Sequence, residues 1–341
     1  MADPGLTQQI ALANINWEIV AVIVAIGLPL IASLYSKWQQ RKKETEFKSQ
    51  MDSSIRDADA LLDSSEYTDA INKYDSVLNT ISPKNYPDQW GNCKNSIGMA
   101  FYNLSLIINQ ELNIKRGIQA YKEALLIFTK DRHPFNYAIT QNNLGSAYVA
   151  LSGIREKEDN LEKAIDAFKE AQKGYIIESY PIDYAMTQNN LGIAYTALSQ
   201  IREREDNLQK AINAFKEALK MNTIDDNPIN YAATQNNLGG AYVALSKVRE
   251  NENNLQKAIN AFEEALKVYT IDGRPINYAK VQNNLGSAYA NLSRVRENEN
   301  NLQKAINAFE EALKVYTIES YPIDYAITQN NLELARNYLR P

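Results

Sequence analysis

The sequence predicts an all-α protein, in which an α-solenoid of stacked helix hairpins follows one N-terminal transmembrane helix. Three observations support this prediction. A long uncharged apolar segment lies near the N-terminus, a unit of 47 residues recurs along the rest of the chain, and apolar residues within each unit are spaced by three and four. No hairpin dipeptide lies between segments of alternating polarity, so strands are not expected.

The apolar segment from Ile19 to Tyr35 contains seventeen residues and no charged side chain. As a helix it spans roughly 26 Å, and a helix from Trp17 to Trp38 spans roughly 33 Å, enough to cross the core of a bilayer. Aromatic residues at both ends match their preference for the membrane interface. We therefore expect a transmembrane helix at residues 17–38, anchored by Trp17, Ile19, Tyr35 and Trp38. A buried soluble helix is the alternative, but a helix that is apolar on every face needs burial all round.

Basic residues follow this segment and none precedes it. They are Lys37, Arg41, Lys42 and Lys43. Because loops rich in Lys and Arg stay in the cytoplasm, the sequence predicts a membrane protein with its N-terminus outside and its repeats in the cytoplasm. A cleaved signal peptide would need basic residues before the segment. Residues 1–16 are then a short tail, and residues 39–54 a basic juxtamembrane linker.

Six prolines mark the repeat, each 47 residues after the last. They are Pro87, Pro134, Pro181, Pro228, Pro275 and Pro322. The phrases QNNLG and NLxKAIxAF recur with the same period, and less regular copies keep the register as far back as Ile71 and Tyr74. We expect repeats over residues 55–320, degenerate up to about residue 130.

Each unit is expected to form two helices, for example Phe135 to Arg155 and Asn160 to Tyr175. Asp159 or Asn160 suits the N-cap of the second helix. The proline ends the unit, because the residue before it avoids helical angles. A single amphipathic hairpin cannot bury its own apolar face, so neighbouring units should stack into a superhelix with a concave side.

These units resemble tetratricopeptide (TPR) repeats. The family pattern L-G-x-x-Y, A-x-x-x-F and P falls on Leu144, Gly145, Tyr148, Ala164, Phe168 and Pro181. Gln141 replaces the Trp of the pattern, and the period exceeds the usual length of about 34 residues. The long units are similar to kinesin-light-chain-type and prokaryotic TPR arrays. The resemblance implies a right-handed superhelix whose first helices line a concave groove that binds a protein or peptide.

Small residues in this pattern allow two helices to approach closely, so we expect Gly145 to face Ala164 and Gly239 to face Ala258. The last copy carries Glu333 at the glycine position. Residues 321–341 are therefore expected to form a C-terminal capping helix, which repeat arrays need.

Carried over by position, the groove would present paired asparagines. They are Asn142, Asn143, Asn189, Asn190, Asn236, Asn237, Asn283, Asn284 and Asn330. One and two turns further along it would present Ser146, Val149, Ile193, Thr196, Gly240, Val243, Ser287 and Ala290. Amides both donate and accept hydrogen bonds, so such a ladder could hold a peptide backbone. In the alternative interpretation, each Asn bonds a neighbouring helix and serves the fold. The groove is mostly uncharged, with Lys280 the main exception, so a clamp for a C-terminal carboxylate is not expected.

Composition restricts the function further. One Cys and one His exclude an intrachain disulfide and a Cys/His metal cluster, and no convergent catalytic set is present, so neither an enzyme nor a cofactor is expected. Acidic residues outnumber basic ones after residue 43, which argues against nucleic-acid binding. The charged runs REKEDN and REREDN are expected to be solvated turns. The sequence thus predicts a membrane-anchored scaffold that binds a protein or peptide partner. The alternative is a structural membrane protein that assembles into a homo-oligomer.

Overall fold

The structure is a computed structural model that describes residues 17–249, 251–296 and 299–339, without the side chains of residues 17–23, 251 and 296. Every regular element within these residues is a helix. The chain forms two compact units, Met1–Thr80 and Ile81–Pro341, which are considered separately below.

The first unit is a hairpin of a long helix, α2 (Trp17–Asp63), and a short one, α3 (Tyr67–Leu78). Tyr74 in α3 donates a hydrogen bond to Asp59 in α2, and Lys73 forms an ion pair with Asp57. Helix α2 runs without a break through the segment expected to cross the membrane and through the expected linker. These boundaries therefore stay predictions.

Among the residues with described side chains, no helix is long and apolar enough to cross a membrane. The side chains of Trp17 and Ile19 lie outside the described residues. Tyr35 and Trp38 are exposed, with stacked rings 5.8 Å apart, and Lys42 lies over the Trp38 ring. Lys37, Arg41 and Lys43 are exposed on the same helix.

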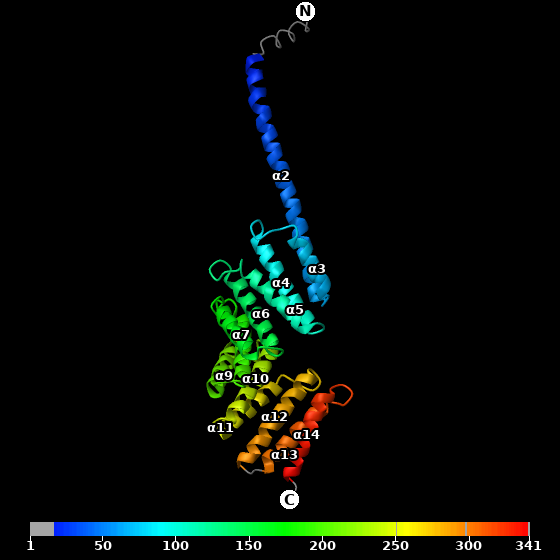
Figure 1. Cartoon of the computed structure of the whole chain (residues 1–341), viewed down its shortest axis with the longest axis vertical. Helices are drawn as coiled ribbons and strands as arrows, with labels where there is room; N and C mark the ends of the chain where they lie inside the picture. The colour runs from blue at the N-terminus through cyan, green and yellow to red at the C-terminus, as the bar shows by residue number, and fades with distance from the viewer. Residues whose placement is uncertain (1–16, 250, 297–298, 340–341) are drawn as a thin grey trace, which may run out of the picture. The chain divides into compact units, whose positions relative to one another are not determined.

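The second unit is a series of helix hairpins in which each helix packs on the next (Figure 1). The first helices of the repeats are α4 (Pro87–Ser105), α6 (Pro134–Ser152), α8 (Pro181–Leu198), α10 (Pro228–Ser246) and α12 (Pro275–Arg296), and α14 (Pro322–Leu339) follows them. The second helices are α5 (Gln110–Ala124), α7 (Lys157–Gln172), α9 (Arg204–Met221), α11 (Asn251–Leu266) and α13 (Glu299–Leu313). The five first helices and α14 each begin at a repeat proline. The fixed φ of proline and its missing N–H suit the first turn of a helix.

The second helices begin earlier than the sequence predicts. Helix α7 follows Glu156, whose φ of 45° is left-handed, so the expected N-cap at Asp159 or Asn160 is wrong. Asn160 instead lies in the first turn, buried, and its Nδ2 donates to the carbonyl oxygen of Arg155 at 2.9 Å. The same bond joins Asn207 to the carbonyl of Arg202. This side chain therefore closes the turn between the two helices instead of capping the helix.

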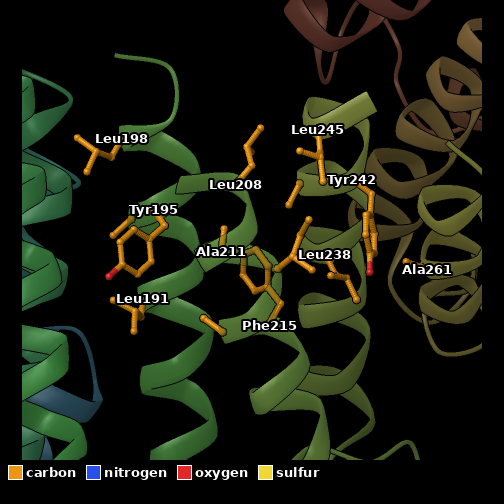
Figure 2. Close-up of a cluster of buried hydrophobic side chains, with 14 of the residues drawn as sticks. Leu191, Tyr195, Leu198, Leu208, Ala211, Phe215, Leu238, Tyr242, Leu245 and Ala261 are labelled. Carbon is orange, nitrogen blue, oxygen red and sulfur yellow. The ribbon is translucent and has the colours of Figure 1, made fainter. Parts of the chain in front are cut away.

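The core lies between the helices of successive hairpins. Figure 2 shows Leu191 and Tyr195 of α8, Phe215 of α9 and Leu238 and Tyr242 of α10 gathered there, all buried. Each of α7, α9, α11 and α13 carries one Phe that is 1% exposed, and α5 carries Tyr121 at the same position. The phenylalanines are Phe168, Phe215, Phe262 and Phe309. The repeat therefore places one large ring at the same point of every interface.

The glycine that recurs in α4, α6, α8, α10 and α12 faces this ring. A Cβ added at Gly145 would lie 2.6 Å from the ring of Phe168, and one at Gly239 would lie 2.6 Å from that of Phe262. The expected pairing of Gly145 with Ala164 is therefore wrong: the glycine makes room for an aromatic ring four residues further along the second helix. Glu333 takes the glycine position in α14 and is exposed.

The first helices form the inner wall of this stack. Each contacts the first helix of the next repeat, as α6 contacts α8 and α8 contacts α10. Within the part of the chain that is described, no second helix contacts the next second helix. The first helices are therefore closer to one another than the second helices are. A stack with two such rows curves toward the closer row, so the first helices lie on the concave side.

Candidate functional site

The paired asparagines of the inner wall form a ladder between repeats. In each step, the second Asn of one repeat donates from Nδ2 to Oδ1 of the first Asn of the preceding repeat. The steps are Asn143 to Asn95 (3.4 Å), Asn190 to Asn142 (3.1 Å), Asn237 to Asn189 (3.1 Å) and Asn284 to Asn236 (3.0 Å). The ladder thus connects helices α4, α6, α8, α10 and α12, so the asparagines do serve the fold.

One member of the ladder, Asn142, and one asparagine outside it, Asn283, accept a bond from a threonine of the next repeat. Asn142 is buried and accepts from Thr187 as well as from Asn190, and Oδ1 of Asn283 accepts from Thr328 of α14. Asn330 is exposed on α14 and is not part of the ladder among the described contacts. The nine asparagines expected in the groove are therefore not equivalent, because they differ in burial and in hydrogen bonding.

Some members of the ladder keep an amide group without a described partner. In Asn189 the carbonyl accepts a bond while the Nδ2 group has no partner among the described residues. In Asn190 the Nδ2 group donates while Oδ1 has none. Both residues are half-buried. The ladder therefore fixes the amide orientation and still offers hydrogen-bonding groups to a ligand.

Three hollows lie along the inner wall of this unit. The first, about 180 Å³, is lined by residues of α4, α6, α7 and α8, including Ser146, Val149 and Ile193. The second, about 350 Å³, includes Thr196 and Ala244, and the third, about 280 Å³, is lined by residues of α10, α12, α13 and α14.

Seven of the eight inner-wall positions that the TPR resemblance places beyond the asparagines line these hollows. They are Ser146, Val149, Ile193, Thr196, Val243, Ser287 and Ala290. The eighth, Gly240, is exposed with nothing within 4 Å of an added Cβ. Their position within the repeat therefore correctly predicted that these side chains lie at the inner wall.

Sequence reasoning missed an apolar column at the start of the first helices. It consists of the isoleucine after each of the last four prolines, between 43% and 75% exposed. Its members are Ile182, Ile229, Ile276 and Ile323. On α8, Ile182, Met186 and Ile193 are spaced by four and seven and therefore share one face. This spacing is the signal that could have found them.

Charge on the inner wall also differs from the prediction. Lys280 is exposed but lines none of the three hollows, whereas Lys247 and Arg294 line the third and Arg204 the second. Lys247 and Arg294 hold equivalent positions in successive repeats, 47 residues apart, where α8 has Gln200. The expectation of a mostly uncharged groove is therefore wrong for this end of the stack.

Charged turns join consecutive repeats. Arg155 contacts Glu111 at 2.9 Å and Arg249 contacts Glu205 at 2.5 Å, each reaching the second helix of the preceding repeat. Hydrogen bonds from Lys115 and Arg155 lower the pKa of Glu111. The runs REKEDN and REREDN, expected to be solvated turns, instead enter α7 at Lys157 and α9 at Arg204. Within them, Asn160 and Asn207 are buried. The exposed charges of these runs also bridge the repeats.

Tyrosine hydroxyls join the two helices within a repeat. Tyr231 donates to Glu264 at 2.8 Å, and Tyr137 donates to Glu170 in the same way. Hydrogen bonds from Lys267 and then Tyr231 hold the pKa of Glu264 below its usual value. These contacts fix the start of the first helix, and with it the apolar column, against the second helix.

A family model for the tetratricopeptide repeat matches residues 193–225, 239–270 and 279–317. No curated protein matches the chain. Its fold is similar to that of the Cut9–Hcn1 hetero-tetramer of the APC/C, with a TM-score of 0.53 and 18% identity over 83% of this chain. This chain spans 42% of that longer one.

Two further solved structures are similar over most of both chains. PilF of Pseudomonas aeruginosa has a TM-score of 0.49 and 14% identity, covering 82% of this chain and 96% of its own. NprR in complex with its cognate peptide NprX has a TM-score of 0.47 and 16% identity, covering 93% and 88%. The family match and the Cut9 likeness agree on an all-α, TPR-like solenoid.

Proposed function

The chain carries tetratricopeptide repeats, and from this premise we propose that it is a membrane-anchored scaffold that binds a protein or peptide segment along its inner wall, without catalysis. The observation that carries the proposal is the row of three hollows on consecutive first helices. A row of hollows suits an extended segment whose successive side chains enter successive hollows.

The amide ladder supports the same occupant. Asn189 keeps an N–H donor and Asn190 keeps a carbonyl acceptor without a described partner. A peptide bond offers the complementary pair, so the ladder can hold a backbone of any sequence. Selectivity then comes from the hollows, which receive side chains.

The membrane anchor in the proposal rests on the apolar segment from Ile19 to Tyr35 and on the basic residues after it. Tethering raises the local concentration of the binding surface, so that weak contacts along the groove become sufficient. We propose that the repeats lie on the cytoplasmic side, because the basic cluster follows the apolar segment. Alkaline carbonate extraction of cell membranes tests the anchor: the full chain should stay in the pellet, and release into the supernatant would contradict it.

Partner capture tests the groove. Ala290→Trp puts a large side chain into the third hollow, and Asn260→Trp places the same residue at an exposed position of α11. The full chain and both variants are used as bait in native membranes, after circular dichroism has shown equal helix content. The wild type and Asn260→Trp should retain a protein that Ala290→Trp loses. An identical set of proteins on all three would contradict the proposal, and capture of the chain itself would favour the homo-oligomer.

A further inference from the structure

The second and third hollows of the inner wall share a cationic edge. Lys247 lines both of them, Arg204 lines the second and Arg294 the third. All three side chains are exposed. Among the described residues, no Asp or Glu lines either hollow. Within the described part of the chain, the only charged side chains that line these two hollows are therefore positive.

These cations differ from three arginines of the charged turns that join the repeats. Arg155, Arg202 and Arg249 are each satisfied by a glutamate of the preceding repeat. Arg204 and Lys247 have no ion pair among the residues that the structure describes, and Arg294 lies over the ring of Tyr338 at 5.2 Å. In a chain with a net charge of -5, three cations without a carboxylate partner in one groove leave charge for a ligand to neutralise.

We propose that the occupant of this part of the groove is an acidic, extended segment of a partner protein. Its carboxylates bind Lys247, Arg294 and Arg204, and its apolar side chains enter the third hollow beside Val243, Ala290 and Leu334. The proposal rests on the proposed function and adds the chemical class of the ligand. Carboxylates and guanidinium groups form charge-assisted hydrogen bonds, which are stronger than those between neutral groups.

The first hollow, at the other end of the inner wall, restricts which part of the ligand is acidic. It is lined by Tyr102, Ser146, Val149, Phe168, Asn190 and Ile193, without a charged side chain. An apolar residue of the same segment fits there. The ligand is thus acidic where it contacts α8 to α14 and apolar where it contacts α4 to α8.

The surface suits a peptide better than a nucleic acid. Nucleic-acid binding gains its free energy by neutralising many phosphates, and the salt dependence grows with their number. Three cations in a chain with more acidic than basic residues supply little of that free energy. The third hollow instead places apolar residues beside the cations. An extended peptide in which acidic and apolar side chains alternate can contact both.

Selection from a random library of twelve-residue displayed peptides tests the ligand class. The bait is the full chain in detergent micelles, as wild type and as the double variant Lys247→Glu with Arg294→Glu. The wild type should enrich peptides rich in Asp and Glu, and the double variant should not. Enrichment of neutral or basic peptides by the wild type, or acidic peptides enriched equally by the double variant, would overturn the inference while leaving a peptide groove intact. Failure to enrich any peptide would count against both proposals.

Fluorescence anisotropy with the most enriched peptide measures the contribution of the cations. The double variant should weaken binding roughly tenfold, because each exposed charge pair contributes up to about 1 kcal/mol. Arg132→Glu makes the same change of charge on an exposed turn outside the hollows and serves as the control. Equal affinity in the double variant and the control would refute the cationic edge as the binding surface. Competition by a single-stranded oligonucleotide at equal concentration would refute the choice of a peptide.

Discussion

The repeats built from α6 to α9 and from α10 to α13 share a core and differ at the inner wall. Leu191 and Leu238 are buried at the same position, and so are Phe215 and Phe262. At the end of the first helix, however, successive repeats carry Gly153, Gln200, Lys247 and Arg294. Burial against two neighbours restricts the core to residues of one size, whereas side chains facing solvent are free to differ. The region that differs is therefore where recognition can vary along the stack.

The largest effect should come from the ring that both regions share. Phe168→Ala and Phe262→Ala each remove a side chain that is 1% exposed, at an expected cost of about 3–5 kcal/mol in the free energy of unfolding. Guanidinium denaturation followed by circular dichroism measures this cost. If the two variants lose very different amounts of stability, the cores of the two regions are not equivalent.

Two adjacent glycines should respond in opposite directions. Gly239→Ala places a Cβ 2.6 Å from the ring of Phe262, so it should destabilise by about 1–3 kcal/mol. Gly240→Ala meets nothing within 4 Å and should stabilise by up to about 1 kcal/mol through helix propensity. Thermal melts of both variants measure the difference, and equal melting temperatures would refute the glycine–phenylalanine contact.

The asparagine ladder should contribute unequally along its length. Asn142→Ala removes the buried acceptor of Asn190 and one of the two acceptors of Thr187, at an expected cost of about 1–3 kcal/mol. Asn330→Ala changes an exposed residue outside the ladder and should cost less than about 0.5 kcal/mol. Chemical denaturation compares them, and a matching loss at Asn330 would show that the ladder is not what stabilises the stack.

The smallest effect concerns pH. The pKa of Glu264 is lowered in the folded state, first by Lys267 and then by Tyr231, so its contribution is present at neutral pH and is lost as the pH falls below its usual pKa of 4.5. Glu264→Gln should therefore reduce the loss of stability between pH 7 and pH 3. Glu217→Gln removes the equivalent carboxylate of the preceding repeat, which forms an ion pair with Lys220 but has no described bond from a tyrosine. Chemical denaturation at pH 7 and at pH 3 measures the free energy of unfolding. The substitution Glu217→Gln should alter its pH dependence less than Glu264→Gln does.

Much of the fold could be predicted from the sequence because two strong local signals agree. The repeat prolines fix where each first helix begins, and apolar residues spaced by three and four identify the buried face. The contact of Gly239 with Phe262 could not be predicted in the same way. It depends on how far one helix slides along the other, which a residue pattern does not specify.

The candidate site was only partly predictable for a similar reason. The resemblance to TPR repeats correctly predicted that Ser287 and Ala290 lie at the inner wall, where they line a hollow. Lys247 and Arg294 lie one turn beyond the positions considered, where the rise of the helix still keeps them on the groove face. The bonds between asparagines link residues 48 apart in different repeats, so they follow from stacking and not from any single unit.

Site-specific photo-crosslinking in living cells tests most directly whether the inner wall holds a partner. A benzophenone side chain is placed at Ala290, in the third hollow, and separately at Asn260, exposed on α11. Irradiation should yield a discrete protein adduct at position 290 and none at position 260, and the adduct should disappear with Lys247→Glu and Arg294→Glu. An adduct at position 260 alone, or no adduct at either position, would contradict binding at the inner wall.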